Sequence, residues 1–332
     1  MKSRSFIIKS AFIFCLLLGA SAGSRAQVDP HFSQYYAYPL WLNPAMTGVS
    51  DGDYRAGVNI KNQWGGLSKS FFTGGASFDM AANDKLAFGA TVLNQRAGEL
   101  SFNYLTALVS ASYRIRFGHS GLNIVSFGLQ GGIINRSFDA SSAQFGSDFN
   151  PVTGMGSGSS EAIMSESATI PDVNAGVLYF DGNPDQVANV FLGVSAAHLT
   201  RPTERFLGSS QRLPMRLTAH GGARFRVSQS FDIVPNALAM FQGNAEEIAA
   251  GAYGQLALNQ QASLLFGGNY RFDDAGIVTA GIQYKNLVLG ISYDINTSSL
   301  RTATNRNGGL EVSISLVGRN GLIGPNFFCP RL

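Results

Sequence analysis

Apolar and polar side chains alternate along residues 105–117, and this pattern strongly limits what the chain can fold into. Successive side chains of a β-strand point to opposite faces, so the segment predicts a strand with one apolar and one polar face. Leu108 is the one apolar residue in the polar set. We expect Leu105, Ala107, Val109, Ala111, Tyr113, Ile115 and Phe117 on the apolar face, and Thr106, Ser110, Ser112, Arg114 and Arg116 on the polar face.

The same alternation recurs along residues 54–61, 215–226 and 310–316. An outer-membrane barrel needs strands of about 9–11 residues with lipid on one side and water on the other. No segment after the N-terminal region has the roughly 20 consecutive apolar residues of a membrane-spanning helix. The pattern therefore predicts that the chain enters a membrane as strands.

The N-terminal region has the features of a secretory signal peptide. Lys2, Arg4 and Lys9 make a basic start, an apolar run covers 11–22, and residues 24–26 provide small residues before Gln27. We expect residues 1–26 to be removed. Cys15 would support lipoprotein processing, but Phe14 occupies a position that requires a small residue.

Composition agrees with a barrel in lipid. Removing residues 1–26 takes away four basic residues and no acidic one, which leaves 20 basic against 21 acidic residues and gives no electrostatic support for nucleic-acid binding. Charged residues are 14% of the chain, against roughly 25% in soluble domains. Cys329 is the single cysteine after residue 26, so no internal disulfide can form.

We expect an all-β transmembrane antiparallel β-barrel of about fourteen strands, occupying residues 53–317. If the chain starts in the periplasm, the long connections 136–171, 200–212 and 296–307 all lie outside the cell and the short ones lie inside, as in known barrels. The predicted strands are 54–64, 71–79, 85–95, 101–117, 122–135, 172–180, 189–199, 213–227, 231–242, 246–258, 262–271, 275–284, 286–295 and 308–317.

Two segments do not read as barrel wall. Residues 27–52, here called the lead-in, contain Pro30, Pro39 and Pro44 and lack a strand period, and proline is poorly tolerated inside paired strands. We expect the lead-in to plug the lumen or to lie on the periplasmic rim. Residues 318–332 form a short C-terminal tail, which we expect on the periplasmic side together with the N-terminus.

Several longer motifs resemble one family. Residues 29–48, with the sequence DPHFSQYYAYPLWLNPAMTG, resemble the opening signature of the PorP/SprF family of type IX secretion proteins. The resemblance continues at 62–64, 290–300, 310–316 and 329–331. Leu332 departs from the family, which commonly finishes on Phe. The resemblance implies an integral outer-membrane barrel of gliding or surface-decorating bacteria. Such proteins hold periplasmic ring components at the membrane, or help to export and anchor secreted surface proteins.

No motif in the sequence indicates an enzymatic activity. The four histidines are scattered without metal-ligand spacing, and there is no nucleophile elbow or phosphate-binding loop. We therefore predict no catalytic, metal or cofactor-binding residue, no small-molecule substrate and no nucleic-acid partner.

The candidate contact residues lie in the lead-in and the tail, where they either bind a partner or plug the lumen. They are Asp29, Pro30, His31, Phe32, Ser33, Gln34, Tyr35, Tyr36, Pro39, Trp41, Asn43, Pro44, Phe327, Phe328, Cys329, Pro330 and Arg331. Eight basic residues fall on the polar phase of predicted strands and would line an anion-selective pore or, as we favour, pair with lumen carboxylates and fix the plug. They are Arg55, Lys61, Arg114, Arg116, Arg216, Arg224, Arg226 and Arg271.

Two functions remain open from the sequence. The first is a non-enzymatic type IX secretion component in the outer membrane, which binds machinery or secreted surface proteins. The second is a transport channel of the fatty-acid transporter type, which also has fourteen strands and an N-terminal plug. The lead-in signature and the tail favour the first.

Overall fold

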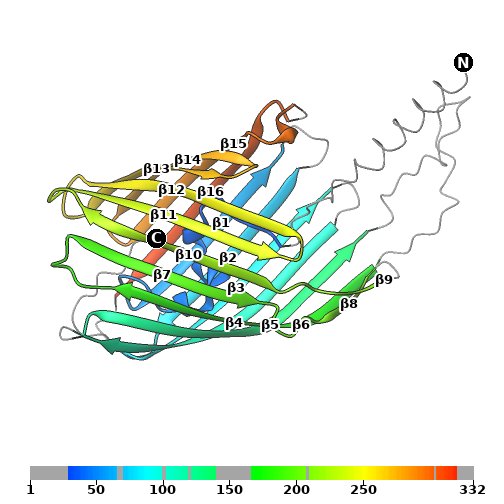
Figure 1. Cartoon of the computed structure of the whole chain (residues 1–332), viewed down its shortest axis with the longest axis horizontal. Coiled ribbons are helices and arrows are strands. Elements are labelled where there is room, and N and C mark those ends of the chain that lie inside the picture. Colours follow the sequence, from blue (N-terminus) through cyan, green and yellow to red (C-terminus); the bar gives the residue numbers. More distant parts are fainter. Residues whose placement is uncertain are drawn as a thin grey trace, which may run out of the picture.

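The computed structural model describes residues 29–65, 70–98, 102–118, 121–139, 166–206, 209–302 and 304–319, which form a closed antiparallel barrel (Figure 1). β1 pairs with β16 from Tyr54 opposite Gly318 to Gln63 opposite Gly309, and this ladder closes the wall. The barrel strands are β1 (Tyr54–Gln63), β2 (Phe71–Ala81), β3 (Leu86–Ala97), β4 (Phe102–Phe117), β5 (Asn123–Phe138), β6 (Glu166–Asp181), β7 (Ala188–Ala197), β10 (Arg216–Arg226), β11 (Phe231–Gln242), β12 (Ala245–Ala257), β13 (Ala262–Arg271), β14 (Ala275–Tyr284), β15 (Leu287–Asn296) and β16 (Asn307–Gly318).

These fourteen strands confirm the predicted barrel, with two differences in detail. The predicted connection 200–212 contains a separate two-stranded sheet, β8 (Thr203–Phe206) and β9 (Ser209–Arg212). The predicted connection 136–171 is wrong at both ends, because β5 reaches Phe138 and β6 begins at Glu166. Pro171 lies where β6 pairs with β5 and not yet with β7, and such a position tolerates a missing N–H.

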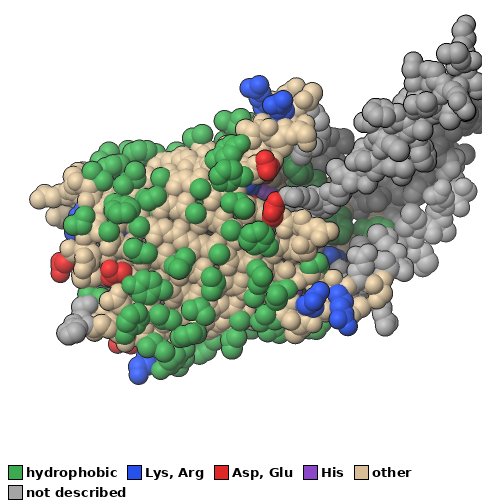
Figure 2. Space-filling model, in the orientation of Figure 1, with side chains coloured by type: hydrophobic (Ala, Val, Ile, Leu, Met, Phe, Trp, Pro, Cys, Tyr) green, Lys and Arg blue, Asp and Glu red, His purple; other side chains and the backbone are tan. Residues whose placement is uncertain are grey.

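The two faces of the wall follow the predicted alternation. Val109 is 66% exposed on the outer surface, whereas its neighbour Ser110 is 5% exposed and faces the lumen. Hydrophobic side chains are spread over the outer wall in Figure 2, as contact with lipid requires. Leu108, the exception in the alternation, faces inward and packs in an apolar cluster with Tyr38 and Trp41 of the lead-in.

The barrel has two distinct ends. At the end here called the loop end, the chain passes from β5 to β6, from β7 to β10 and from β15 to β16. At the opposite turn end it passes from β4 to β5, from β10 to β11 and from β14 to β15. In Figure 1 the loop end carries β8 and β9.

The lead-in crosses the lumen between these ends. It contains three short helical turns, η1 (Tyr35–Ala37), α2 (Pro39–Leu42) and η2 (Pro44–Met46), two of which begin with proline. Proline suits a first helical position because its fixed φ is preorganised and no N–H is needed there. Asp29 contacts residues at the loop end, and Asp53 bonds to the last residue of β16 at the turn end. The lead-in therefore extends inside the barrel from the loop end to the turn end.

Within the described residues, no helix has the length and apolar character needed to cross a membrane.

Candidate functional site

The candidate site is the lead-in together with the inner wall that holds it, and it begins with a buried ionic cluster at the loop end. Asp29 Oδ2 accepts hydrogen bonds from Arg216 Nη1 at 3.0 Å and lies 2.7 Å from His198 Nε2. His198 Nδ1 lies 2.9 Å from Asp172 Oδ1. The guanidinium of Arg216 also stacks on the ring of Trp41, 4.4 Å from its centroid. The first residue of the described lead-in is therefore tied to β6, to β10 and to the residue that follows β7.

The charges of this cluster shift the pKa values of two of its members. Burial alone would lower the pKa of His198, but the Asp29 and Asp172 carboxylates outweigh burial and raise it to about 9. Burial alone would raise the pKa of Asp29, and His198 and Arg216 instead hold it well below its usual range. His198 is therefore an imidazolium at neutral pH, with a carboxylate at each ring nitrogen.

A second cluster joins the lead-in to strands β1, β13, β15 and β16. Ser33 donates from its backbone N–H to Glu311 Oε2 and from its hydroxyl to Asp294 Oδ2, each at 2.6 Å. Lys61 is fully buried, donates to Ser33 Oγ at 2.8 Å and lies 3.3 Å from Asp294 Oδ2. Arg271 donates to Asp294 Oδ2 at 3.0 Å. Because isolated buried charge is costly, these cations and carboxylates stabilise each other and hold Ser33 between them.

His31 is close to this cluster without joining it as a cation. Burial, together with the nearby Lys61 and Arg271, holds the pKa of His31 well below its usual range. Its Nδ1 lies 3.8 Å from Glu247 Oε2. Since His31 is neutral, this contact is not an ion pair.

Halfway across the lumen the lead-in bonds to inward-facing wall groups. Asn43 donates through Nδ2 to the carbonyl oxygens of Val177 and Val194, and its Oδ1 accepts from the Ala45 N–H. Tyr38 donates to the Val92 carbonyl at 2.7 Å. Polar groups at the middle of the lead-in thus bond to the wall and to the lead-in itself.

At the turn end, Asp79 of β2 holds both the lead-in and Arg55. Its Oδ2 accepts from the Gly48 N–H at 2.7 Å and from Arg55 Nη2 at 2.9 Å. Arg114 donates to the Gly48 carbonyl at 3.1 Å, so the backbone of Gly48 is hydrogen-bonded to side chains of both β2 and β4. Gly48 has φ +69°, and a Cβ there would lie 2.2 Å from the Cβ of Ala87, so both conformation and space require glycine.

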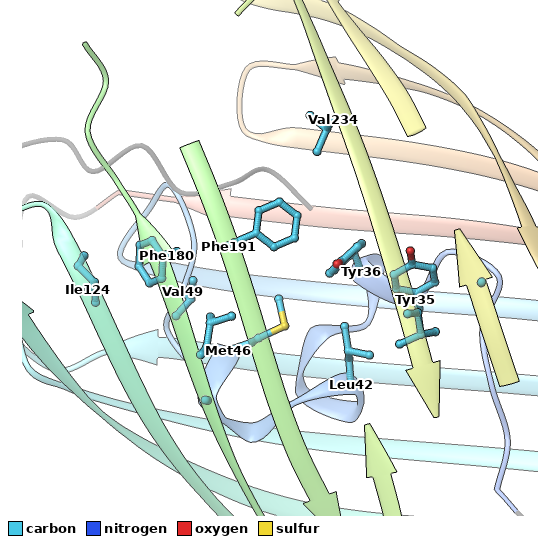
Figure 3. Close-up of a cluster of buried hydrophobic side chains, with 13 residues drawn as sticks. Tyr35, Tyr36, Leu42, Met46, Val49, Ile124, Phe180, Phe191 and Val234 are labelled. Atoms are coloured by element: carbon cyan, nitrogen blue, oxygen red, sulfur yellow. The ribbon is translucent and has the colours of Figure 1, made fainter. Parts of the chain in front are cut away.

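Apolar packing fills the space between these polar anchors. One cluster joins lead-in residues to five wall strands, and Figure 3 shows Leu42 and Met46 among side chains that point inward from the wall. Its members are Tyr35, Tyr36, Leu42, Ala45, Met46, Val49, Ile124, Leu178, Phe180, Phe191, Val234, Leu238 and Ala249. A second cluster joins Phe32, Tyr38 and Trp41 to β3, β4, β5 and β6, with Leu213 beside them.

The lead-in candidates are therefore buried or nearly so. Pro30 accepts from Trp41 Nε1 at 3.0 Å, and Phe32 meets Tyr38 edge-on. Gln34 accepts from Ser313 Oγ, and Pro44 accepts from the Thr47 hydroxyl. The other lead-in candidates are placed above, apart from Tyr35, Tyr36 and Pro39, which line the cavity described below. Phe327, Phe328, Cys329, Pro330 and Arg331 lie outside the described residues, as does the expected signal peptide.

The eight basic candidates divide by position. Arg55, Lys61, Arg216 and Arg271 pair with carboxylates inside the barrel. Arg224 pairs with Asp232 near the turn end, and Arg114 binds carbonyl oxygens. Arg116, partly exposed, reaches Asp84 at 3.5 Å, and Arg226 is exposed and donates to the Pro184 carbonyl. The last two lie at the turn end rather than in the lumen.

Sequence reasoning missed the partners of these cations. Asp79, Asp294 and Glu311 lie on the polar phase of their strands, which was the available signal. His198 gave no signal, because its partner Asp29 is 169 residues away, and Asp172 enters the cluster only through its contact with His198. In the described part of the chain, no group of three or more His, Cys, Asp or Glu residues could hold a metal ion.

A cavity of about 350 Å³ remains between the lead-in and strands β12–β16. Its lining runs from Ser33 and Gln34 to Lys285, Asn286 and Arg319 at the turn end. No lining residue belongs to the cluster of Asp29, His198 and Arg216, so the cavity occupies only part of the length of the lumen.

Comparisons with known proteins agree on fold and family. The model of a family described as type IX secretion system membrane protein PorP/SprF matches residues 24–316. The toluene transporter TbuX of Ralstonia pickettii has a similar structure, with a TM-score of 0.52 and 11% identity over 88% of this chain and 95% of that one. A Pseudomonas aeruginosa FadL homologue matches with a TM-score of 0.44 and 10% identity over 88% of this chain and 94% of that one. No curated protein sequence matches the chain.

At such low identity the likeness to TbuX shows the barrel fold alone. The family match and the fourteen-stranded barrel together place the chain in the outer membrane.

Proposed function

The chain belongs to the PorP/SprF family of type IX secretion membrane proteins, and we propose that it is a non-enzymatic component that supports export or surface anchoring of secreted proteins through protein contacts. Its partners are periplasmic components of the machinery or the secreted surface proteins themselves, in a bacterium that glides or decorates its surface. Residues 1–26 act as a signal peptide, and the loop end faces the cell exterior.

The observation that carries this proposal is the filling of the lumen. The lead-in is bonded to the wall at the loop end through Asp29, in the middle through Asn43 and at the turn end through Gly48. A segment fixed at three levels by buried hydrogen bonds and ion pairs does not move at small cost. The lead-in is thus a fixed plug, and the barrel is a scaffold that presents its two ends to other proteins.

This arrangement also weighs against a channel of the fatty-acid transporter type. The remaining cavity stops at the cluster of Ser33, Lys61 and Asp294, and the lumen cations are paired rather than lining an open path. The aromatics Tyr35, Tyr36, Tyr38 and Trp41 are buried, so they seat the plug and do not form a docking surface. We assign partner contact to the connections and to the tail 318–332.

Deletion of residues 321–332 tests the role of the tail. We expect the truncated barrel to insert in the outer membrane and to resist heat like the full chain, while export or anchoring of the surface protein fails. Pull-down of the full chain from outer membranes should capture type IX secretion proteins that the truncated chain loses. A matched control removes the β8–β9 hairpin at the opposite end, 203–212, and should keep those turn-end partners. Normal export by a folded truncated chain would contradict the proposal.

A further inference from the structure

The wall of the cavity beside the lead-in carries small residues, and packing of the plug does not require all of them. They form a row on adjoining strands: Gly281 of β14 pairs with Gly290 of β15, and Gly290 pairs with Ser313 of β16. All three line the cavity and alternate with outward-facing apolar residues. Gly281 projects no side chain into the lumen, whereas the space at Gly290 is taken by Gln34, whose Oε1 lies 2.4 Å from where a Cβ on Gly290 would be. The opposite wall is filled by packed aromatic and aliphatic groups.

The lining on the lead-in side is aromatic. Tyr35 and Tyr36 line the cavity, and each directs its hydroxyl to the wall, Tyr35 to Asn236 Oδ1 and Tyr36 to the Gly221 carbonyl. The two rings pack against each other, Tyr36 also packs on Phe191 and His220, and each residue keeps only 7% of its surface exposed beside the cavity. Tyr253, Leu265 and Val288 add apolar lining, and the polar side chains of Asn236, Asn269, Thr279, Gln283 and Ser315 lie among them. The aromatic and aliphatic part of this lining can bind a hydrocarbon chain.

The cavity is blind at one end and open at the other. Gln34 and Ser313, bonded at 2.8 Å, stand at the inner end, and the Lys61–Asp294 cluster lies beyond them. Lys285, Asn286 and Arg319 are exposed and form the mouth at the turn end. The six residue steps from Ser313 to Arg319 span roughly 20 Å at strand rise, so the site is long and narrow.

The charges at the mouth are mainly positive. Lys285 and Arg319 stand there with Asp51, whose backbone carbonyl accepts from Arg319 Nε at 2.9 Å. Arg55 also lines the cavity but is paired with Asp79. An apolar interior with a basic mouth is complementary to a molecule that has a hydrocarbon chain and an anionic head.

We propose that this cavity binds a single-chain amphiphile, with its hydrocarbon chain against Tyr35, Tyr36 and Gly281 and its anionic head beside Lys285 and Arg319. The volume of about 350 Å³ lies within the range of about 300–1,000 Å³ that is usual for small-molecule sites. Binding here needs no movement of the plug. The proposal therefore does not depend on the function proposed above and does not imply transport.

Photolabelling tests the site directly. The purified full barrel is placed in phosphatidylcholine nanodiscs with palmitic acid that carries a diazirine in its chain, irradiated, digested and mapped by mass spectrometry. We expect labels on lead-in residues 34–39 and around Tyr253, displaced by unlabelled palmitate. Labels on the lipid-facing wall provide an internal reference in every sample. Labelling confined to that outer wall would overturn the proposal.

Matched variants separate the lumen from the outer surface. Thr279→Phe fills the cavity, whereas Val278→Phe adds the same ring to the lipid-facing side of the same strand. We expect Thr279→Phe to lower lead-in labelling about tenfold or more and Val278→Phe to leave it unchanged. Ser315→Phe and Ile314→Phe repeat the comparison on β16, in case one filled barrel does not fold. Equal labelling in a folded filled barrel and its control would refute the assignment.

The head group is tested at the exposed mouth, where substitution spares the core. Lys285→Glu combined with Arg319→Glu should weaken displacement by palmitate about threefold or more, since exposed charges contribute modestly. Displacement by hexadecanol, which has the same chain without the charge, should stay unchanged. An equal loss for acid and alcohol, or no loss for the acid, would contradict an anionic ligand.

Discussion

Arginine at two adjacent positions of β14, one facing lipid and one facing the lumen, should destabilise the barrel to different extents. Val278 is 58% exposed on the outer wall near the middle of its strand, and Thr279 faces the cavity. Arginine on the lipid face near the midplane of the membrane costs about 2–4 kcal/mol. In Thr279→Arg the guanidinium enters a hollow that opens to water at the turn end, so the free energy of unfolding should change by about 1 kcal/mol or less.

The measurement is reversible unfolding by urea in phospholipid vesicles, followed by tryptophan fluorescence and by the heat-dependent mobility of the folded barrel in gels. Trp41 lies in the plug and Trp64 follows β1, so the signal reports both parts. Val278→Ala and Thr279→Ala serve as controls for loss of the native side chain. Equal destabilisation by the two arginines would refute the assigned faces, and a larger cost at Thr279 would show that the cavity is closed to water.

Three further outcomes follow from the packed part of the lumen. Val109→Arg should cost about 2–4 kcal/mol, because the arginine would contact lipid. Ser110→Arg, measured in the same assay, should cost about 1–3 kcal/mol, because Ser110 is packed against the lead-in and a larger side chain would strain that packing. The pKa of His198, raised to about 9, makes its stabilisation complete below about pH 6.5 and lost as the pH rises through 9. Urea unfolding across this window should show a loss of about 3 kcal/mol that His198→Gln abolishes, and a flat profile in the wild type would contradict the ionic anchor. Lys61→Met should cost about 3 kcal/mol, because Arg271 alone would then face the buried acidic groups of Asp294 and Glu311. Adding Asp294→Leu should cost less than the sum of the single changes in a double-mutant cycle.

Much of the wall could be predicted because its signals are local. The two-residue period assigns each side chain to a face, as Val109 and Ser110 illustrate. The difference between long and short connections assigns each connection to one end of the barrel. The signals failed where pairing extends a strand beyond its predicted bounds. The strand predicted to begin at 172 begins six residues earlier, at Glu166, and this added part, which contains Pro171, pairs with β5 and not with β7.

Leu108 shows a different kind of failure. Its apolar side chain interrupts the polar phase of β4, and nothing in the local sequence explains the interruption. The lead-in brings Tyr38 and Trp41 to that face, so the lumen is apolar at this level and a leucine fits. A position in the polar set of a barrel strand thus predicts that the side chain points inward, but it does not predict that the side chain contacts water.

The sequence by itself determined that this chain is a fourteen-stranded barrel, which face of each strand meets lipid, and that residues 27–52 are not wall. The tertiary structure decided that the lead-in crosses the lumen, that Asp29 meets His198 and Ser33 meets Glu311, and that a cavity remains beside β12–β16. Strand direction and face follow from a residue and its nearest neighbours. Contacts between Ser33 and Glu311, 278 residues apart, depend on the stagger of every strand around the closed wall, and no local pattern contains that information.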